Sequence, residues 1–317
     1  MTRVLIGRLR VVVPTILLIT ILTFALRVII PGGPADALLG GSDNPDTIKM
    51  INERYGLDQP IWQQYFSWLG GMLRGDLGTS YATGLPVSDV IGPRLASTVE
   101  IVGLGMLLAI LAGGAIGMYA AIHRSTRLGR LVFAATGIGV SLPVFWFATI
   151  VAGILGVALR ILPVNGYTPL ADGLVPHLSS IAMPVVLIAL PSTALMTRHV
   201  RSTMVAALES PYVRTAWAMG ISSRRVYFDL ALKNAIGPVV SFMPFLAATL
   251  VGELVIIDVV FVLPGLGSAI VDAVHFRDYP SLQAIVLLMS VAVVLLSLIA
   301  DLVLTALDPR RRKEATT

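Results

Sequence analysis

The sequence predicts an all-α polytopic membrane protein with six transmembrane helices, and three observations support this fold class. First, 56% of the 317 residues are hydrophobic and only 13% are charged, whereas a soluble domain usually carries about 25% charged residues. Second, most of the 23 lysines and arginines fall on one side of the membrane if successive apolar segments alternate in direction. Third, six segments are apolar and long enough to cross a hydrocarbon core of about 30 Å, covering roughly residues 10–30, 97–122, 132–158, 180–200, 237–262 and 283–307.

The first apolar segment follows a basic N-terminus that contains Arg3, Arg8 and Arg10. At about 20 residues it is longer than the core of a secretory signal peptide, and no small-x-small cleavage site follows it. We therefore expect an uncleaved transmembrane helix, with the Arg27 side chain near its far end extending toward the interface. The positive-inside rule places both termini and the basic loop 209–237 in the cytoplasm.

Residues 31–96 lie on the opposite side of the membrane and predict an extracytoplasmic cap. Within this region, residues 46–55 predict a short helix. Pro60–Arg74 predicts an amphipathic helix with two tryptophans, which suit the membrane interface. We expect this cap to lie along the membrane, an arrangement that is also compatible with a docking surface for an external partner. The chain therefore divides into two parts: residues 1–96, the first transmembrane helix with the cap, and residues 97–317, a five-helix core that contains loop 209–237.

Loop 209–237 carries its own helix boundaries. Ser210 is a residue type that caps helices, and Pro211 suits the first helical position. Gly220 suits the position just past a helix end, where the backbone adopts a positive φ. These residues predict a short helix over 211–219.

A second helix follows in the same loop. Ser222 or Ser223 is expected to cap it, and Gly237-Pro238 is expected to end it. The first of the two helices carries large apolar side chains, and an exposed apolar patch usually marks a contact surface. We therefore predict that it docks a partner through Tyr212, Trp217 and Met219.

Four acidic residues fall inside or at the start of the apolar segments. A charge at the centre of a bilayer costs about 2.5–3.5 kcal/mol or more, so such residues usually face a bundle interior or water. Two interpretations stay open: satisfied packing or subunit-interface acids, and acids that line a translocation path or gate. No intramembrane lysine or arginine pairs with them in an obvious way, which disfavours a proton relay. The four are Glu100, Glu253, Asp258 and Asp301.

No catalytic, nucleotide-binding or metal-binding set can be assembled from the sequence. It contains no cysteine, no G-x-x-x-x-G-K-[ST] motif and no G-x-S-x-G motif. The histidines are scattered and none forms an H-E-x-x-H motif; they are His123, His177, His199 and His275. Membrane topology, and not nucleic-acid binding, explains the net charge of +5.

The loop motif closely resembles the cytoplasmic "EAA" loop of ABC-importer permeases. The matching stretches are Tyr212-Val-Arg-Thr-Ala-Trp-Ala-Met-Gly220, Arg224-Arg225-Val226 and Leu232-Lys-Asn-Ala235. More narrowly, the chain resembles the first permease subunit of the dipeptide/oligopeptide/nickel group. Other motifs of that group occur in the same order along the chain, including Pro31-Gly-Gly-Pro-Ala35, Tyr55-Gly-Leu-Asp-Gln-Pro60, Gly75-Asp-Leu-Gly78, Ser141-Leu-Pro143, Pro264-Gly-Leu-Gly267, Arg277-Asp-Tyr-Pro280 and Leu307-Asp-Pro-Arg310.

The resemblance implies a type I ABC importer permease fold in a bacterial or archaeal plasma membrane. It implies a second homologous permease subunit, two cytoplasmic ATPase subunits or domains, and an extracytoplasmic substrate-binding protein as partners, besides membrane lipid. ATP and Mg²⁺ would be bound by the ATPases, so this chain would bind no cofactor, metal or nucleic acid and would not be an enzyme. It would form half of the translocation pore of a peptide importer.

The resemblance also assigns roles to individual residues. The ATPase-coupling loop would use Pro211, Tyr212, Arg214, Thr215, Ala216, Trp217, Ala218, Met219, Gly220 and Arg224. An external gate or docking loop would contain Pro264, Gly265 and Gly267. Glu253, Asp258 and Asp301 remain candidate pore or interface acids.

The chain departs from the family pattern at several of these positions. The customary acidic-Ala-Ala start of the loop reads Thr215-Ala-Trp217, and Trp217 and Met219 stand where the group usually has basic residues. Asp258 stands where Glu is common and Glu253 where a small residue is common. Nickel, haem and glutathione are alternative substrates within the group. A self-sufficient secondary transporter is a second class, disfavoured because the sequence shows no inverted repeat.

Overall fold

The computed structural model describes residues 2–29, 46, 49–50, 52–53 and 56–307. In this part of the chain five helices are long and apolar enough to cross a membrane, and a bent pair completes six if it crosses as one. The single helices are α1 (Thr2–Ile29), α5 (Val87–Ile122), α8 (Leu174–Leu208), α11 (Leu232–Val260) and α13 (Tyr279–Leu307). The predicted all-α class and the six apolar segments are therefore confirmed, with the third segment bent.

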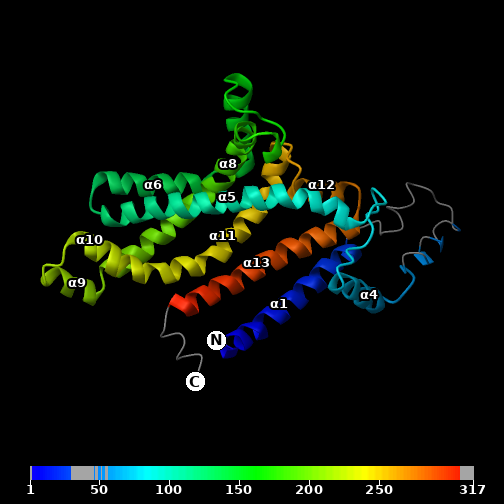
Figure 1. Ribbon diagram of the computed structural model, residues 1–317, viewed down its shortest axis with the longest axis horizontal. Helices are drawn as coiled ribbons and strands as arrows, with labels where there is room; N and C mark the ends of the chain where they lie inside the picture. The colour runs from blue at the N-terminus through cyan, green and yellow to red at the C-terminus, as the bar shows by residue number, and fades with distance from the viewer. Residues whose placement is uncertain (1, 30–45, 47–48, 51, 54–55, 308–317) are drawn as a thin grey trace.

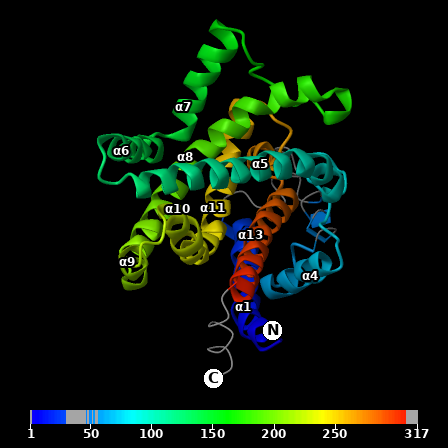
Figure 2. The same ribbon diagram turned by 60° about the vertical axis from the view of Figure 1, so that its left-hand side comes forward.

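The long helices form an elongated bundle (Figures 1 and 2). Helix α5 packs along α8, α11 packs against α8 and α13, and α1 packs against α13. Glycines on α5 allow its backbone to approach α8 closely: a Cβ added to Gly113 would lie 2.7 Å from the Met196 Cβ, and one added to Gly117 would lie 2.7 Å from the Thr197 carbonyl oxygen. Small residues at such contacts are typical of membrane bundles, where packing and not water exclusion holds helices together.

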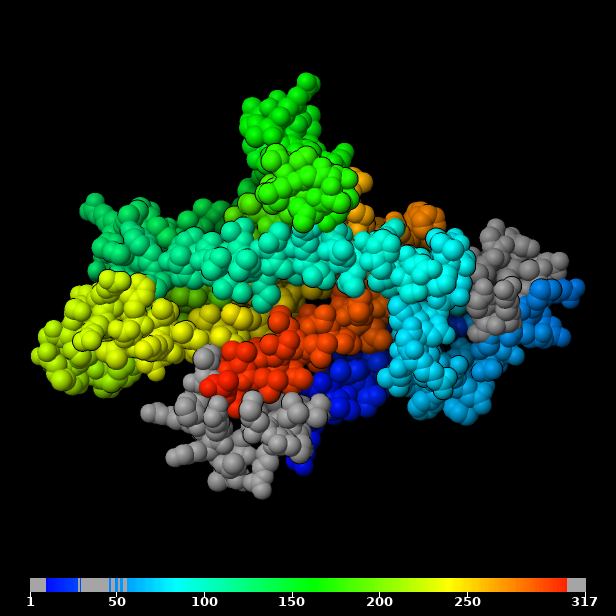
Figure 3. Space-filling view, in the orientation of Figure 1, coloured from blue at the N-terminus to red at the C-terminus, as the bar shows by residue number. Residues whose placement is uncertain are grey.

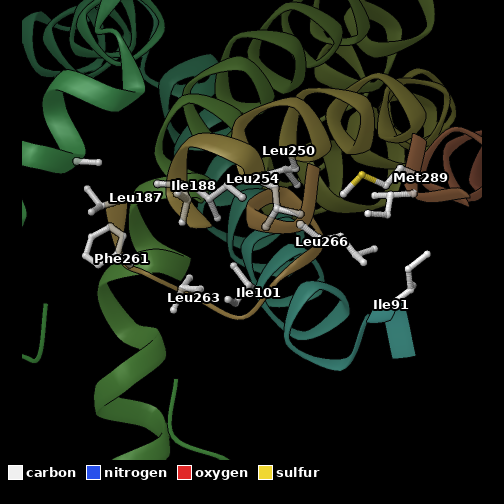
Figure 4. Packing of buried hydrophobic residues seen from close by; sticks show 14 of the residues in the cluster. Ile91, Ile101, Leu187, Ile188, Leu250, Leu254, Phe261, Leu263, Leu266 and Met289 are labelled. Carbon is white, nitrogen blue, oxygen red and sulfur yellow. The ribbon is translucent and has the colours of Figure 1, made fainter. Parts of the chain in front are cut away.

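The largest hydrophobic core lies where α5, α8, α11 and the short helix α12 (Leu266–His275) meet (Figure 4). Ile101, Ile188, Leu250 and Leu254 are completely buried there. Helix α12 falls between the predicted transmembrane segments 237–262 and 283–307 and follows the predicted external loop at Pro264 and Gly265. Its apolar face packs into the core, which makes the connection part of the bundle.

The third predicted segment, 132–158, is not one straight helix. It consists of α6 (Arg127–Ser141), α7 (Val144–Val151) and the π-helical η1 (Ala152–Ala158), with a bend of 99° between α6 and the α7–η1 unit. The bend lies at Pro143, which lacks an N–H group and whose ring clashes with the preceding turn of a helix. Figure 2 shows α7 extending away from the bundle.

A second correction concerns loop 209–237. The helix that begins after Ser222 does not end at Gly237-Pro238: α10 (Ser223–Arg225), η3 (Val226–Ala231) and α11 form one continuous apolar helical stretch through Pro238 and Pro244. Membrane helices tolerate proline because neighbouring groups satisfy the freed backbone atoms. The His199 Nε2 also lies 3.1 Å from the Pro238 carbonyl oxygen, a contact that joins α8 to α11 at this point.

At the opposite end of the bundle, α4 (Ile61–Leu73) confirms the predicted amphipathic helix. It packs on α1 through aromatic rings, with the Phe24 and Tyr65 ring centroids 5.5 Å apart. Half of the predicted helix 46–55, and all of 31–45, lie outside the described residues. A short 3-10 turn, η2 (Leu170–Asp172), precedes α8.

Candidate functional site

Helix α9 (Pro211–Ala218) lies at one end of the bundle, between the end of α8 and the start of α10. In Figure 1 it occupies the left-hand end, opposite α4, and in the space-filling view its segment projects beyond the long helices (Figure 3). The predicted helix 211–219 is therefore present within one residue. Its position makes it accessible to a partner that approaches this end.

The start of α9 depends on Pro211 at its first position, where the missing N–H group costs nothing and the restricted φ favours the helix. Ser210 occupies the cap position but does not cap with its side chain. Its hydroxyl donates to the Ala207 carbonyl oxygen at 2.5 Å, so it finishes α8 instead. The prediction of a side-chain cap at Ser210 was wrong, because the preceding carbonyl competes for the hydroxyl.

The end of α9 is a Schellman motif. The Gly220 N–H donates to the Trp217 carbonyl at 3.0 Å, and the Ile221 N–H donates to the Ala216 carbonyl at 3.1 Å. Gly220 has a φ of +76°, in the left-handed region that this motif requires and that glycine adopts without strain. The predicted role of Gly220 as a helix terminator with positive φ is confirmed.

Helix α9 has an inner and an outer face. Val213 and Ala216 are buried against Val226 of η3, with Ile221 beside them. The outer face, defined here as Tyr212, Trp217 and Met219, has side chains that are 42%, 41% and 74% exposed. The apolar residues that the sequence singled out thus point outward, and α9 presents them from a backbone anchored by its inner face.

The other predicted loop residues divide between these faces. Ala216 faces its own chain, so a change there acts on the anchoring of α9 before any partner is involved. Arg214, Thr215 and Ala218 are exposed. Arg224 borders a cavity of about 640 Å³ with Ser222, Arg225, Phe228 and Asp229.

An ion pair braces the base of α9. The Arg124 Nη1 lies 2.6 Å from the Glu209 Oε1, and both side chains are partly exposed. Arg124 belongs to the connection between α5 and α6, so the pair ties that connection to Glu209 at the end of α8. The Trp217 ring also packs edge-on against Tyr227, with centroids 6.0 Å apart. Both contacts limit the directions in which α9 can move.

Asp258, a candidate pore acid, is fully buried. Its Oδ2 accepts hydrogen bonds from the backbone N–H groups of Gly267 at 2.8 Å and Ser268 at 3.3 Å. It therefore caps the first turn of α12 from the neighbouring helix. Its other oxygen, Oδ1, is buried without a hydrogen-bond partner among the described residues.

The predicted external loop at Pro264, Gly265 and Gly267 is also tied into the core. The Ser97 hydroxyl donates to the Pro264 carbonyl at 2.7 Å. The Leu266 N–H donates to the Thr98 hydroxyl at 2.8 Å. The loop is thus held by α5 on one side and by Asp258 on the other.

The remaining candidate acids lie apart from this capping site. Glu253 is half-buried on α11, and its Oε2 is buried without a hydrogen-bond partner among the described residues. Asp301 is half-buried on α13. Across the described residues, no three His, Cys, Asp or Glu side chains gather in a way that could hold a metal ion.

Sequence reasoning missed one polar network, which joins Glu100 of α5 to His177 of α8. The His177 Nε2 lies 2.7 Å from the Glu100 Oε1, and its Nδ1 lies 2.8 Å from the Thr168 carbonyl oxygen. Tyr167 donates to the other Glu100 oxygen at 2.6 Å. Both ring nitrogens of His177 thus lie within hydrogen-bond distance of an oxygen atom.

This network pins the connection between η1 and α8 to the bundle. Burial and the hydrogen bond to Glu100 raise the pKa of Tyr167 to about 12, so its hydroxyl remains a donor across the physiological range. The sequence contained no signal for this network, because its members are separated by 67 and 77 positions and form no motif.

Comparison with known proteins gives a consistent result. Residues 113–313 match the family described as "Binding-protein-dependent transport system inner membrane component". Residues 1–102 match its companion for the N-terminal region of such membrane components.

Individual relatives extend over nearly the whole chain. The "Probable peptide ABC transporter permease protein y4tP" of Sinorhizobium fredii is 34% identical, covering 93% of this chain and 94% of its own length. The "Glutathione transport system permease protein GsiC" of Salmonella paratyphi A is 34% identical over 96% and 97%. Among solved structures, the inward-facing methionine transporter MetNI matches with a TM-score of 0.57 at 17% identity, covering 69% of this chain and 96% of the matched one, which shows a shared fold.

Proposed function

This chain belongs to the family of binding-protein-dependent transport system inner membrane components, and we propose that it is the first permease subunit of an ATP-driven peptide importer. The family and a relative described as a peptide ABC transporter permease support this proposal. The chain is a membrane subunit of a transporter that works with ATPase subunits and a binding protein. It forms half of the translocation pore and performs no catalytic step itself.

The observation that carries the coupling role is the geometry of α9. A short helix with a firmly anchored inner face and an apolar outer face can transmit a rigid-body displacement, because its buried contacts move with it. We propose that the outer face docks a cytoplasmic ATPase subunit. Closure of the ATPases around ATP then displaces α9 and biases the bundle between two access states.

The orientation follows from the same assignment. Docking to cytoplasmic ATPases places α9 on the cytoplasmic side, with both termini on that side and α4 on the extracytoplasmic side. The positive-inside rule supports this orientation, because Arg124, Arg214 and Arg224 all lie at the α9 end. The extracytoplasmic end is then available to a substrate-binding protein.

A second homologous permease is proposed as the membrane partner. Helix α7 and η1 extend from the bundle with apolar side chains in the open, including Phe145, Trp146 and Val157 at 57%, 53% and 66% exposed. A projecting apolar arm is suited to contact another membrane helix. ATP and Mg²⁺ are assigned to the ATPase partners, because the chain lacks a P-loop motif.

The substrate class is tested by uptake. Cells that lack this gene are expected to lose ATP-dependent uptake of labelled di- and oligopeptides, and the restored gene is expected to recover it. Glutathione, itself a tripeptide, is the first alternative because of the GsiC relative, with nickel chelates and haem after it. Unchanged peptide uptake in the deletion strain, or uptake by this chain alone in liposomes, would contradict the proposal.

A further inference from the structure

A cavity of about 480 Å³ lies at the α4 end of the bundle, between α1, α4, α13 and the connection 76–81. Its walls are joined by contacts that do not depend on a ligand. The Gln283 side-chain amide lies 3.4 Å from the carbonyl oxygens of Thr23 and Phe24, which links α13 to α1. The Phe24 and Trp68 rings pack with centroids 5.7 Å apart, which links α1 to α4. The cavity is therefore preformed.

Two hydrogen-bond donors in the lining of this cavity lack partners. The Arg27 Nη2 and the Trp68 Nε1 are both buried, and neither has a hydrogen-bond partner among the described residues. Buried donors without partners are rare in native proteins and usually mark a missing ligand or water. A guanidinium and an indole N–H together match the oxygen atoms of an anion, with the guanidinium suited to phosphate.

The level of the cavity along the membrane-spanning helices indicates which kind of molecule supplies that anion. The membrane-spanning window of α1 ends at Arg27, and that of α13 begins at Tyr279, which also lines the cavity. The cavity therefore lies at the level where the apolar spans end and lipid headgroups begin. The adjoining helix α4 exposes Trp62, Phe66 and Leu73, apolar side chains that suit insertion at the interface.

Acidic side chains complete the lining and select the headgroup. Glu53 and Asp76 border the same cavity, and one Asp76 oxygen already accepts from the Gly78 N–H at 2.9 Å. The Glu53 carboxylate also lies 4.0 Å from the Lys49 ammonium. A cavity lined by both carboxylates and a guanidinium suits a ligand that carries both charges. We propose that this cavity binds the headgroup of a zwitterionic aminophospholipid, with its phosphate at Arg27 and Trp68 and its ammonium at Glu53 and Asp76.

The proposed orientation places the α4 end, and with it this lipid, in the outer leaflet of the membrane. The binding of lipid in the cavity does not depend on that orientation. The experiment uses the complete transporter, extracted from vesicles of phosphatidylethanolamine mixed with phosphatidylcholine, and counts retained lipids by native mass spectrometry. Phosphatidylethanolamine is expected to remain bound to the wild type. Arg27→Gln is expected to lower its retention about tenfold, the effect of losing a charge-assisted hydrogen bond. Trp68→Phe, which keeps the ring and removes the donor, is expected to give a smaller loss.

Arg74→Gln is the matched control, because Arg74 is exposed at the end of α4 and does not line the cavity. It should retain lipid as the wild type does. Equal retention by Arg27→Gln, or an equal loss in Arg74→Gln, would overturn the proposal. In vesicles where phosphatidylglycerol replaces phosphatidylcholine, retention of phosphatidylglycerol equal to that of phosphatidylethanolamine would overturn the ammonium assignment. A soluble dipeptide carries the same pair of charges as the headgroup. Displacement of the lipid by such a dipeptide would show that the cavity binds a soluble ligand and not a lipid headgroup. Retention is independent of transport, so failure of the peptide-importer proposal would leave this readout intact.

Discussion

The turn after α9 allows a sharp test of the coupling proposal through Gly220→Ala. Gly220 has a φ of +76°, and a Cβ added there would meet no atom within 4 Å. The substitution therefore causes no clash and acts through the backbone alone. An L-residue in the left-handed region costs about 1–2 kcal/mol, which corresponds to a factor of about 5–30 in an equilibrium.

If ATPase docking requires the Schellman turn, this cost appears as weaker binding of the ATPase subunits, because the competent state is less populated. We expect Gly220→Ala to weaken the affinity between the purified permease complex and its ATPases about 5–30-fold. Gly220→Asn should weaken it less, since asparagine tolerates the left-handed region better than alanine does. Affinity is measured by titrating labelled ATPase onto the permease in nanodiscs, and transport-coupled ATP hydrolysis should fall in the same order.

Gly84→Ala is the control, because Gly84 has a φ of +72° and open space around its Cα but lies far along the chain from α9. The same strain there should leave ATPase affinity unchanged. Wild-type affinity and coupled hydrolysis in Gly220→Ala would refute the docking assignment. An equal loss in Gly84→Ala would show that general destabilisation, and not the α9 turn, causes the effect.

Two further predictions concern the bundle. Gly113→Ala should destabilise the purified protein by about 1–3 kcal/mol, since the new Cβ would lie 2.7 Å from the Met196 Cβ. The control is Gly114→Ala, whose Cβ would have no atom within 4 Å and which should leave the thermal midpoint unchanged. Equal midpoints for both variants would contradict close α5–α8 packing. Tyr167→Phe should cost about 1.5–3 kcal/mol through the lost bond to Glu100. Because the pKa of Tyr167 is raised from 10.0 to about 12 in the folded protein, its contribution is fully present below pH 10 and is lost as pH rises through 12. The Tyr167→Phe difference in thermal midpoint should therefore be constant from pH 6 to 9, and a difference that changes within that range would contradict this account.

Much of the fold follows from local features of the sequence. The apolar segments, the amphipathic α4 and the short α9 were all predicted, because hydropathy and helix-boundary residues such as Pro211 and Gly220 act over a few neighbouring positions. The family resemblance depends on the same local motifs. The predicted outer face of α9 also follows from residue type, since large apolar side chains on a short polar helix favour a contact surface.

Other predictions failed because a distant group or a competing local one decided the outcome. The straight helix over 132–158 bends at Pro143, and the helix expected to end at Gly237-Pro238 continues, although both sites carry proline. Tertiary packing determines whether a helix continues through a proline, with neighbouring groups stabilising it, or bends there. Ser210 likewise failed as a side-chain cap because a carbonyl of α8 competed for its hydroxyl.

The sequence by itself determined that this chain crosses the membrane several times and presents a short helix at one end, because burial in lipid imposes continuous apolar runs and turns need particular residues. Only the tertiary structure decided which side chains meet. It buried Ala216 on the inner face of α9 and made Asp258 the cap of α12. It also joined Glu100, Tyr167 and His177 in one network. It also left the Arg27 and Trp68 donors facing a cavity. These roles depend on distances between residues far apart in the chain, and no local pattern encodes those distances.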